Sequence, residues 1–567
     1  MVQPVAQHEF PDVEVAGRRY QPCQPDLLAG AEDRFGLLTE SLQVRGAIAL
    51  DYISRAGVQV DLIQVEQVRE QIAQVVAAQG ELLEQLARDL GEPELFQRRG
   101  KKKGPVNGPY LFRLDHARQE LRRTASGVPR KQSKAVKRIL ERIGQELGLR
   151  PRRNKDGLVT DSVAYWSQRA EDHPFLACYC TWSAQGKLAQ FFSKLGAERI
   201  HPRYVPLVRT GRSSCRQPNL QQLPRASQFR EMIVAAPGQW LLAIDYSTLE
   251  LRTLAQICLR RFGRSKLAEV FAAGGDPHSY TAAILQQLSV EQFQALPQEE
   301  RKTARQRAKA VNFGTPGGLG APALMAYAKT AYGVEMSLDE AKKLRRRLIT
   351  EVYPELRLYL AENRCRILAA NMLAPVDAVA AAMPDRNLFD IALNIIGNAA
   401  AVEEYGQEKC DFMWSHLQRL NSSPDLAPLL EKREPSELLA RRLFFGHAAT
   451  LSGRVRGHVR FTARCNAPFQ GLAADGAKLA LFELVRAGYR VFGCIHDEVL
   501  IEIPKSWDLN KAYEHVEQIL CYAMRQMTPD IPIACEGLLA DRWYKGVDAN
   551  QRDAQGRLVP YIGKRQG

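Results

Sequence analysis

Residues 240–252 read WLLAIDYSTLELR, and this stretch decides the fold class. Its first part, Trp240 to Asp245, is a continuous apolar run that ends at a carboxylate, which is typical of a strand buried on both faces. From Thr248 to Arg261 the apolar residues return at helical spacing. We therefore predict a buried strand whose exit places Asp245 at a cleft, with a helix directly after it.

A second stretch, RQRAKAVNFG at residues 305–314, lies in a predicted helix that runs from Arg301 to Phe313. Four of its side chains recur every four residues and share one face: Arg301, Arg305, Lys309 and Phe313. A cationic row that ends in an aromatic ring fits a triphosphate along the row, with the base and sugar against the ring. An ordinary solvated basic face is the alternative interpretation.

The third stretch, IHDE at residues 495–498, lies within an alternating apolar and polar pattern from Val491 to Ile503. Alternation on both sides of His496 and Asp497 predicts a tight hairpin with these two residues at its turn. Asp245 and Asp497 are therefore both expected at strand ends. Each of them, taken alone, is also consistent with a capping or turn residue.

In this order the three stretches resemble the three motifs of A-family DNA polymerases, the DNA polymerase I type. Further segments extend the resemblance: TGRSS at 210–214 with PNLQ at 218–221, GDPH at 275–278, and NAPFQG at 466–471. The resemblance covers roughly residues 45–546 and is dense from Arg212 onward. It implies an α+β fold, a right-hand polymerase with a helical thumb, helical fingers and an antiparallel-sheet palm.

The implied domain organisation follows the chain. It comprises an irregular N-terminal lead-in (1–45), a thumb (46–205), the first part of the palm (206–275), fingers (276–449) with an inserted helical element near 372–449, the second part of the palm (450–546) and a C-terminal tail (547–567). Apolar periodicity predicts an amphipathic helix from about Ala47 to Arg88 and further basic helical segments to about Leu149.

The resemblance implies a metal site built on two carboxylates. Nucleotidyl transfer needs the charge on the leaving pyrophosphate neutralised, and Mg²⁺ prefers a few carboxylates together with phosphate and water oxygens. Asp245 and Asp497 are implied to hold two Mg²⁺ ions, with Mn²⁺ as an alternative, and the backbone carbonyl of Tyr246 is implied as a further ligand. Glu498 is implied to tune this catalytic site.

The resemblance also implies a nucleotide site. Arg305 and Lys309 are assigned to the triphosphate, with His278 and Phe313 as further contacts of the incoming dNTP. Glu250 is implied to occupy the space that a ribose 2′-OH would need, which excludes ribonucleotides. Phe in place of Tyr at position 313 implies discrimination against dideoxynucleotides.

Six side chains are implied to bind primer-template DNA: Arg212, Asn219, Gln221, Asn466, Gln470 and His496. The minor groove presents similar acceptors in every base pair, so such side chains can sense correct pairing without reading the sequence. A local cap or turn is the alternative role for any one of them. The basic run from Arg98 to Lys103 and the basic residues between Arg122 and Arg138 are expected to contact phosphates.

Bulk composition favours a polyanionic partner over a neutral metabolite, because the 567 residues carry a net charge of +15 with a pI near 9.3. The eleven cysteines show no C-x-x-C spacing, so reduced thiols without zinc are expected. The N-terminus lacks a signal-peptide pattern, and no apolar run approaches the roughly 18 residues of a membrane span. We expect a cytoplasmic protein of a bacterium or a phage-infected host, with no membrane contact.

The chain departs from the family pattern near the end of the second stretch. Gly317 stands where a Tyr beside the templating base is usual, and Pro316 should end the helix because its ring clashes with the carbonyl four residues back. Template positioning and fidelity are therefore expected to differ. Thr462 stands where an Arg is common, and Arg464 is expected to substitute for it from a nearby turn.

We expect a monomeric DNA-directed DNA polymerase that extends a primer 3′-OH with dNTPs, in replication or repair. About 45 residues before the thumb are too few for a proofreading nuclease, so no exonuclease activity is expected, and a nuclease or other replication proteins would be separate, as in a phage-like replicon. A single-subunit RNA polymerase is one alternative, which Glu250 disfavours. A catalytically decayed DNA-binding protein is the other, which the intact Asp245, Lys309 and Asp497 disfavour.

Overall fold

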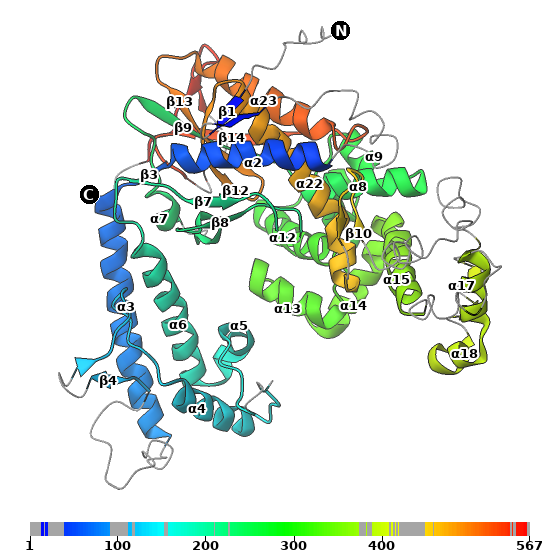
Figure 1. Ribbon diagram of the computed structural model, residues 1–567, viewed down its shortest axis with the longest axis horizontal. Helices are drawn as coiled ribbons and strands as arrows, with labels where there is room; N and C mark the ends of the chain where they lie inside the picture. Colours follow the sequence, from blue (N-terminus) through cyan, green and yellow to red (C-terminus); the bar gives the residue numbers. More distant parts are fainter. Residues whose placement is uncertain are drawn as a thin grey trace.

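The computed structural model describes residues 13–15, 18–20, 39–90 and 111–563, apart from gaps at 116–119, 152, 154–156, 209, 225–226, 373–381, 383–387, 408–409, 412–413, 416–417, 419–447, 457–458, 545–546 and 548–550. Many helices surround a few small antiparallel sheets, so the fold is α+β as predicted (Figure 1). None of the described helices is both long enough and apolar enough to cross a bilayer.

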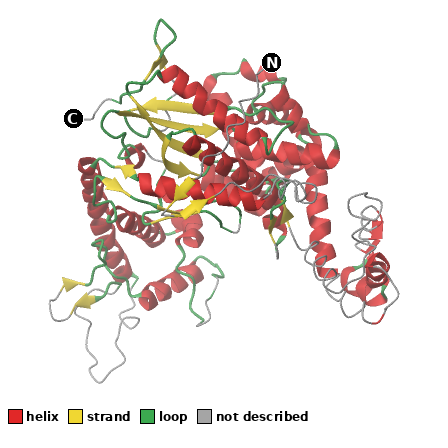
Figure 2. Cartoon of the chain, turned by 45° about the horizontal axis from the view of Figure 1, so that its top comes forward, coloured by secondary structure: helices red, strands yellow, loops and turns green. Residues whose placement is uncertain are grey.

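A four-stranded antiparallel sheet holds the predicted buried strand in its interior (Figure 2). The strand β9 (Gln239–Tyr246) pairs with β13 (Glu498–Pro504) on one side and with β14 (Cys535–Ala540) on the other, and β12 (Arg490–Ile495) completes the order β12-β13-β9-β14. Leu241, Leu242 and Ile244 of β9 are fully buried, which confirms the strand. The predicted hairpin is β12–β13.

Three helices pack around this sheet: α2 (Thr39–Ala56), α22 (Phe461–Arg486) and α23 (Leu509–Arg525). The helix α2 lies along α22 and β12, and α22 also packs against α23 (Figure 1). One continuous apolar core joins the sheet and these helices. The helix α2 begins at Thr39, so the predicted boundary between the lead-in and the thumb, at residues 45–46, falls inside this helix. The helix α2 packs against α22 and against the edge strand β12 of the sheet.

The single helix predicted from Ala47 to Arg88 is wrong, because two helices occupy this range. The helix α2 ends at Ala56, the short strand β3 (Val58–Gln59) follows, and α3 (Leu62–Asp89) begins after the N-cap residue Asp61. Gly57 has a φ of 68°, and a Cβ on it would come within 2.6 Å of the His201 ring. The break is therefore imposed by a turn that only glycine fits.

The helices α3 and α6 (Pro174–Phe192) pack side by side as an arm that extends from the sheet, with α4 (Ser133–Glu146) near its far end (Figure 1). The prediction of basic helical segments up to Leu149 is wrong in part, because two short strands precede α4: β4 (Leu114–Asp115) and β5 (Glu120–Leu121). The basic run from Arg98 to Lys103 lies outside the described residues. Lys131 and Lys137 both form ion pairs with Asp161.

A second group of helices follows β9 in the sequence. Its members are α8 (Leu249–Phe262), α9 (Lys266–Ala272), α10 (Pro277–Leu285), α11 (Val290–Gln294), α12 (Gln298–Gly314), α13 (Ala321–Tyr332), α14 (Leu338–Arg347), the π-helical turn η4 (Leu348–Val352), α15 (Glu355–Met372), α17 (Leu388–Gly397) and α18 (Ala399–Tyr405). The helix α12 confirms the predicted helix from Arg301 to Phe313. It ends at Gly314, two residues before Pro316, as the proline predicts.

Shorter elements complete the described chain. They are β1 (Val13–Val15), β2 (Arg18–Tyr20), α5 (Val163–Trp166), η2 (Ser167–Asp172), β6 (Arg199–Ile200), β7 (Arg203–Val205), β8 (Ser214–Arg216), η3 (Leu220–Gln222), α7 (Ser227–Arg230), β10 (Ala448–Ala449), β11 (Val455–Arg456), β15 (Gln551–Arg552) and β16 (Leu558–Val559). The lead-in is therefore not irregular throughout, because β1 and β2 pair as an antiparallel hairpin. Nine cysteines whose side chains the structure describes are free thiols.

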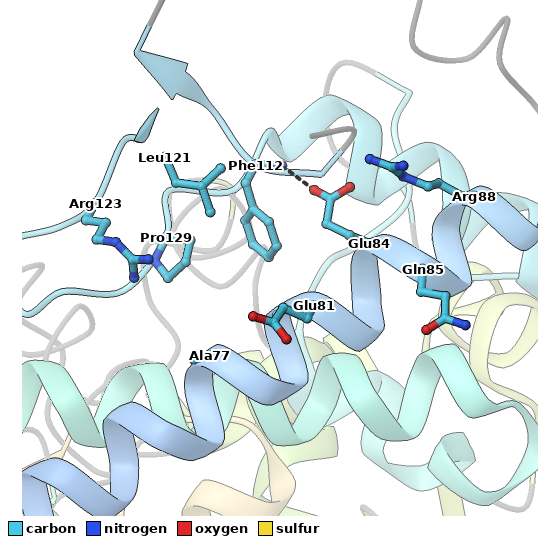
Figure 3. Close-up of a pocket in the computed structure, with 10 residues that line it drawn as sticks. Ala77, Glu81, Glu84, Gln85, Arg88, Phe112, Leu121, Arg123 and Pro129 are labelled. Atoms are coloured by element: carbon cyan, nitrogen blue, oxygen red, sulfur yellow. Dashed lines mark hydrogen bonds between the residues drawn. The ribbon is translucent and has the colours of Figure 1, made fainter. Parts of the chain in front are cut away.

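The arm carries a cavity of about 400 Å³ beside α3 (Figure 3). Gly80, Phe112 and Leu121 contribute its apolar lining. The Glu84 carboxylate at its edge accepts hydrogen bonds from the backbone N–H groups of Leu111 and Phe112, at 2.8 and 3.2 Å. All its lining residues lie between positions 77 and 129, so it contains none of the predicted catalytic side chains.

Candidate active site

The sheet brings the two predicted metal-binding aspartates to one end of β9. Ile244 of β9 pairs with Val499 of β13, and continuing this antiparallel register places Asp497 opposite Tyr246, one residue from Asp245. The strand β12 ends at Ile495 and β13 begins at Glu498, so His496 and Asp497 form a two-residue hairpin turn. His496 has a φ of 62°, the positive value that such tight turns require. The predicted placement of both carboxylates at strand ends is confirmed.

The connection from β9 to α8 is also tight. Thr248, the N-cap residue of α8, has a φ of 53°, which is rare for a β-branched residue and costs about 1–3 kcal/mol. The strain lets the chain pass from strand to helix within two residues, so Glu250 in the first turn of α8 lies close to the end of β9. Strained backbone of this kind clusters at functional sites.

The electrostatics of this end of the sheet favour a cation. Burial raises the pKa of Asp497. Burial also raises the pKa of Glu250, and the negative charge of Asp497 adds to this rise although Arg212 opposes it. The carboxylates of Asp497 and Glu250 are therefore close enough to repel each other in a partly desolvated setting, which a cation would relieve.

The donor set fits Mg²⁺ but not a metal held by protein ligands alone. Within the described ranges, no group of three or more His, Cys, Asp or Glu side chains is arranged to hold a metal ion. Two aspartates and a backbone carbonyl are hard oxygen donors, and Mg²⁺ usually takes its remaining ligands from water and substrate phosphates.

Glu498, in contrast, faces the interior. It is 6% exposed; its Oε1 accepts a hydrogen bond from Trp543 Nε1 at 2.9 Å and its Oε2 from Arg230 Nη1 at 3.4 Å. The Arg230 guanidinium also lies over the Trp543 ring, 4.2 Å from its centroid. These partners hold the Glu498 carboxylate in a buried ion pair, and its predicted role in tuning the metal site stays a prediction.

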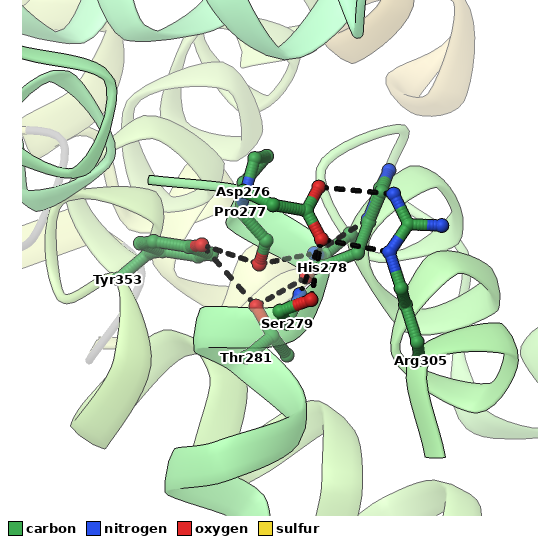
Figure 4. Close-up of polar contacts among 8 residues, drawn as sticks. Asp276, Pro277, His278, Ser279, Thr281, Arg305 and Tyr353 are labelled. Carbon is green, nitrogen blue, oxygen red and sulfur yellow. Dashed lines mark hydrogen bonds and ion pairs between the residues drawn. The ribbon is translucent and has the colours of Figure 1, made fainter. Parts of the chain in front are cut away.

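The cationic face of α12 meets the start of α10 (Figure 4). Arg305 donates from Nε and Nη2 to the two carboxylate oxygens of Asp276, at 2.7 and 3.1 Å. Burial alone would raise the pKa of Asp276, but the hydrogen bonds from Arg305 and Ser279 hold it well below its usual value. A bidentate pair with an always-ionised carboxylate fixes the plane of the guanidinium. Asp276 is a site residue to which the sequence reasoning gave no role.

His278 follows on the same turn and is 1% exposed. Burial lowers its pKa to about 4, with Arg305 and Lys309 adding to the effect, so the imidazole is neutral at pH 7. Asn312 Nδ2 lies 3.1 Å from His278 Nδ1, and the amide nitrogen can only donate, so Nδ1 accepts and the ring proton belongs on Nε2. The ring centroid lies 5.3 Å from that of Phe313. The structure thus brings together Arg305, Lys309, His278 and Phe313, as predicted.

The predicted DNA-binding residues are bonded to protein groups in this structure. Arg212 forms an ion pair with Glu250. Asn219 caps the turn η3 by accepting from Gln221 N–H at 3.1 Å, and the Gln221 side chain donates weakly to Ser213 Oγ at 3.4 Å. Asn219 therefore has the capping role that was the alternative to DNA binding, and its contact with DNA stays a prediction.

The helix α22 presents Asn466 and Gln470 one turn apart, and His496 is exposed on the neighbouring hairpin. Asn466 Nδ2 donates to the backbone carbonyl of Gly317 at 2.9 Å, a contact that sequence reasoning missed. Arg464 is not on a turn as expected, because it lies within α22 and is 3% exposed. Arg464 is therefore buried and does not lie at the surface of this helix as a substitute for the Arg that is common at position 462.

These features agree with the comparison to known proteins. Residues 113–373 match the family model "DNA polymerase family A". This region of the chain belongs to DNA polymerase family A. The match includes Asp245 and the whole of α12 and ends before Asn466 and Asp497.

Curated relatives are DNA polymerases I. The chain is 26% identical over 366 residues to DNA polymerase I of Aquifex aeolicus, a match that covers 63% of this chain and 48% of that protein. It is 29% identical over 335 residues to the chloroplastic DNA polymerase I A of Oryza sativa subsp. japonica, covering 54% of this chain and 25% of that protein. The matches thus span about half of one relative and a quarter of the other.

A solved structure shares the fold. It is the POL domain of Pol1 from M. smegmatis in complex with DNA primer-template and dNTP, with a TM-score of 0.52 and 20% sequence identity over 88% of this chain and 70% of that chain. The fold of the chain is therefore that of the predicted right-hand polymerase, with the antiparallel sheet as its palm and helical thumb and fingers.

Proposed function

We propose that this chain is a DNA-directed DNA polymerase that extends the 3′-OH of a DNA primer with dNTPs and releases pyrophosphate. The observation that carries the proposal is the register of β9 and β13, which brings Asp497 beside Asp245 and Tyr246. The relatives named DNA polymerase I and the neighbour solved with primer-template and dNTP support the same reaction.

In this proposal Asp245, Asp497 and the Tyr246 carbonyl would hold two Mg²⁺ ions, or Mn²⁺ in their place. When bound, the ions supply charge neutralisation at the attacking and leaving oxygens of an in-line displacement. The raised pKa of Asp497, which burial causes, agrees with a carboxylate that awaits a positive partner.

The nucleotide would bind along α12. Arg305, held in plane by Asp276, and Lys309 would neutralise triphosphate charge, while the neutral His278 would donate its Nε2 proton to a phosphate oxygen. Phe313 would pack against the nucleotide. Glu250, in the first turn of α8, would exclude a ribose 2′-OH.

The DNA would lie across α22 and the loop before β8. Arg212, Asn219, Gln221, Asn466, Gln470 and His496 are the side chains assigned to the primer-template duplex. Arg212 is paired with Glu250 and Gln470 donates a long hydrogen bond to Asn466 Oδ1 in the present structure, so DNA would exchange these bonds for contacts with minor-groove acceptors.

Primer extension tests the proposal. The protein is incubated with a labelled primer-template, four dNTPs and Mg²⁺, and the products are resolved on a gel. We expect extension by the wild-type chain and none by Asp497→Asn, whose side chain has the same shape but no charge, while both bind the duplex equally in a fluorescence-anisotropy titration.

Asp339→Asn is the matched control, because Asp339 is 90% exposed at the start of α14. It should extend like the wild type. Extension by Asp497→Asn at near wild-type rate would disprove the metal assignment. Failure of the wild type to extend any primer, or incorporation of rNTPs in preference to dNTPs, would contradict the proposed function itself.

A further inference from the structure

A buried network of polar side chains joins the start of α10 to α12 and to the residue that follows η4 (Figure 4). Thr281, Asn312 and Tyr353 are each at most 1% exposed. The Thr281 hydroxyl donates to Asn312 Oδ1 at 3.1 Å and lies 3.2 Å from the Tyr353 hydroxyl, which itself donates to the Pro277 carbonyl at 3.0 Å. Because these side chains are shielded from solvent, each polar group depends on the others for its hydrogen bonds.

The Pro277 carbonyl decides which way the Asn312 amide is turned. Asn312 Nδ2 donates to this carbonyl at 3.2 Å, and a carbonyl oxygen can only accept. With the amide turned over, Oδ1 would face the carbonyl and two acceptors would oppose each other. The Thr281 hydroxyl favours the same orientation, because it donates to Oδ1. Turning the amide over would therefore lose both hydrogen bonds in a place where water cannot replace them.

The orientation of the Asn312 amide in turn decides where His278 carries its proton. Nδ2 lies 3.1 Å from His278 Nδ1, so Nδ1 accepts and the proton of the neutral ring lies on Nε2. Burial, Arg305 and Lys309 lower the pKa of the ring to about 4, and the charge of Asp276 opposes them, so the ring is neutral at pH 7. In the described part of the chain, Nδ1 is the only ring nitrogen of His278 with a hydrogen-bond partner.

We propose that Asn312 is a positioning residue for the incoming nucleotide: it holds His278 as the Nε2–H tautomer, so that the ring presents a neutral donor to a phosphate oxygen. The inference rests on the proposed function, because it assigns the residue that prepares His278 for its role in that site. The backbone carbonyl of Pro277, next to His278 in the sequence, selects the tautomer, and Asn312 is the link between the two.

The tautomer matters because the two neutral forms of the ring present opposite groups at Nε2. An N–H at this position donates to an ionised phosphate oxygen, which can only accept. In the other tautomer a nitrogen lone pair would face the same oxygen and repel it. Arg305 and Lys309 are already assigned to the triphosphate, so a neutral donor at His278 orients the phosphate without adding a third positive charge.

Heteronuclear NMR of isotope-labelled histidine rings tests the tautomer and needs no substrate. The signals that His278→Gln lacks identify the His278 ring. We expect the wild type at pH 7 to carry the proton on Nε2. Asn312→Leu, which is similar in size but has no hydrogen-bonding group, should give a mixture of the two tautomers. Asn312→Asp, whose carboxylate only accepts, should place a proton on Nδ1.

Steady-state primer extension tests the effect on the nucleotide. In Asn312→Leu the KM for dNTP should rise about tenfold, the change that one hydrogen bond to a charged group can produce. The loss should appear in KM more than in kcat, with the affinity for duplex DNA in anisotropy titrations unchanged. In a His278→Ala background the same substitution should cause no further loss of kcat/KM, because Asn312 acts through that ring.

Tyr353→Phe is the matched control. It removes another donor to the same Pro277 carbonyl and leaves the contact between Asn312 and His278 in place. It should lower the melting temperature yet keep the wild-type tautomer and the wild-type KM. Circular dichroism melts of all variants show whether the fold is retained, and the wild-type spectrum tests the tautomer without any substitution.

Three results would overturn the inference. They are a wild-type ring with its proton on Nδ1, an Asn312→Leu variant with the wild-type tautomer and KM, and a further loss of kcat/KM in the double variant, which would show that Asn312 acts by another route. A wild type that extends no primer would refute the proposed function, and with it the role at the nucleotide. An Nε2–H ring in that same protein would still uphold the tautomer assignment, so the two failures are distinct.

Discussion

Replacing Glu498 by alanine tests whether this carboxylate serves the metal site or the fold. Glu498 and Arg230 are each 6% exposed and Trp543 is fully buried, so the three groups form a desolvated cluster between the sheet and the segment after β14. The alanine variant removes the acceptor of Trp543 Nε1 and leaves the Arg230 guanidinium buried without this carboxylate.

The size of the effect follows from these contacts. Breaking a buried ion pair by removing one partner costs about 3–5 kcal/mol, because the remaining charge stays desolvated. The ion pair is long, at 3.4 Å, and the guanidinium keeps its contact with the Trp543 ring, so we expect about 3 kcal/mol, the lower end of this range. Removing both charges, as in Glu498→Leu with Arg230→Met, should cost less than Glu498→Ala alone.

Hydrogen exchange at the backbone amides of β13 and β14 is the assay, because it reports local opening of the sheet without assuming that the whole chain unfolds in one step. A loss of about 3 kcal/mol corresponds to exchange that is more than about a hundredfold faster. The surface pair of Asp339 and Lys342, which is 90% and 60% exposed, provides the control, and its removal should change exchange little.

The opposite result would refute this reasoning. If Glu498→Ala keeps wild-type exchange rates while the Mg²⁺ concentration for half-maximal extension rises several-fold, then Glu498 acts on the metal site as the sequence suggested. If exchange accelerates and the Mg²⁺ requirement stays the same, Glu498 is a structural residue of the sheet.

Two further predictions concern the face of α12. Arg305→Lys loses the fork that bonds both oxygens of Asp276, so the KM for dNTP should rise about tenfold in steady-state extension, with the affinity for duplex DNA unchanged. Burial lowers the pKa of His278 in the folded chain to about 4, from its usual 6.5. Between pH 6.5 and 4 the unfolded chain therefore binds a proton at this residue that the folded chain does not bind, so the free energy of unfolding falls as the pH drops through this range. His278→Gln should remove about 2 kcal/mol of that fall, measured from urea unfolding midpoints at pH 6.5 and 4.5, and an equal slope in both proteins would contradict the assignment.

Elements with a strong local pattern could be predicted from the sequence. The apolar run of β9, the alternation around His496 and Asp497 and the four-residue spacing in α12 each repeat the period of the structure that they form. The break between α2 and α3 was missed because the helical pattern continues across it. Only the approach of His201 to Gly57, 144 residues apart in the sequence, makes the turn necessary.

The placement of Glu498 was missed although the sequence contained the signal for it. Adjacent residues of a strand point to opposite faces, so a cleft position for Asp497 favours an interior position for its neighbour at the start of β13. The partner Trp543, in contrast, could not be predicted, because a contact across 45 residues leaves no periodic trace. The same holds for Asp276 with Arg305 and for Gly317 with Asn466.

The long-range contacts share one property that bears on substrate selection. Arg305, Arg212 and Asn466, each assigned to a substrate, are bonded to protein acceptors in the structure. A substrate group that accepts a hydrogen bond from such a donor replaces a hydrogen bond that already exists within the protein. The net free energy gained is therefore the difference between the two hydrogen bonds, which is smaller than the free energy of one. Under the proposed function, a correctly paired duplex and a deoxynucleotide would therefore have to outcompete internal acceptors at several positions at once.

This competition favours discrimination over affinity. In a mismatched or ribose-bearing substrate, one acceptor is misplaced, and the protein donor at that position keeps its internal partner. Such a substrate gains no binding free energy at that position, so it binds more weakly than the correct substrate. Asp276 differs from the other internal acceptors because its pair with Arg305 uses both carboxylate oxygens and orients the guanidinium. In the proposed function Arg305 would then offer its remaining N–H groups to a triphosphate without leaving Asp276, so the nucleotide site would be the preformed part and the DNA contacts the exchangeable part of the proposed active site.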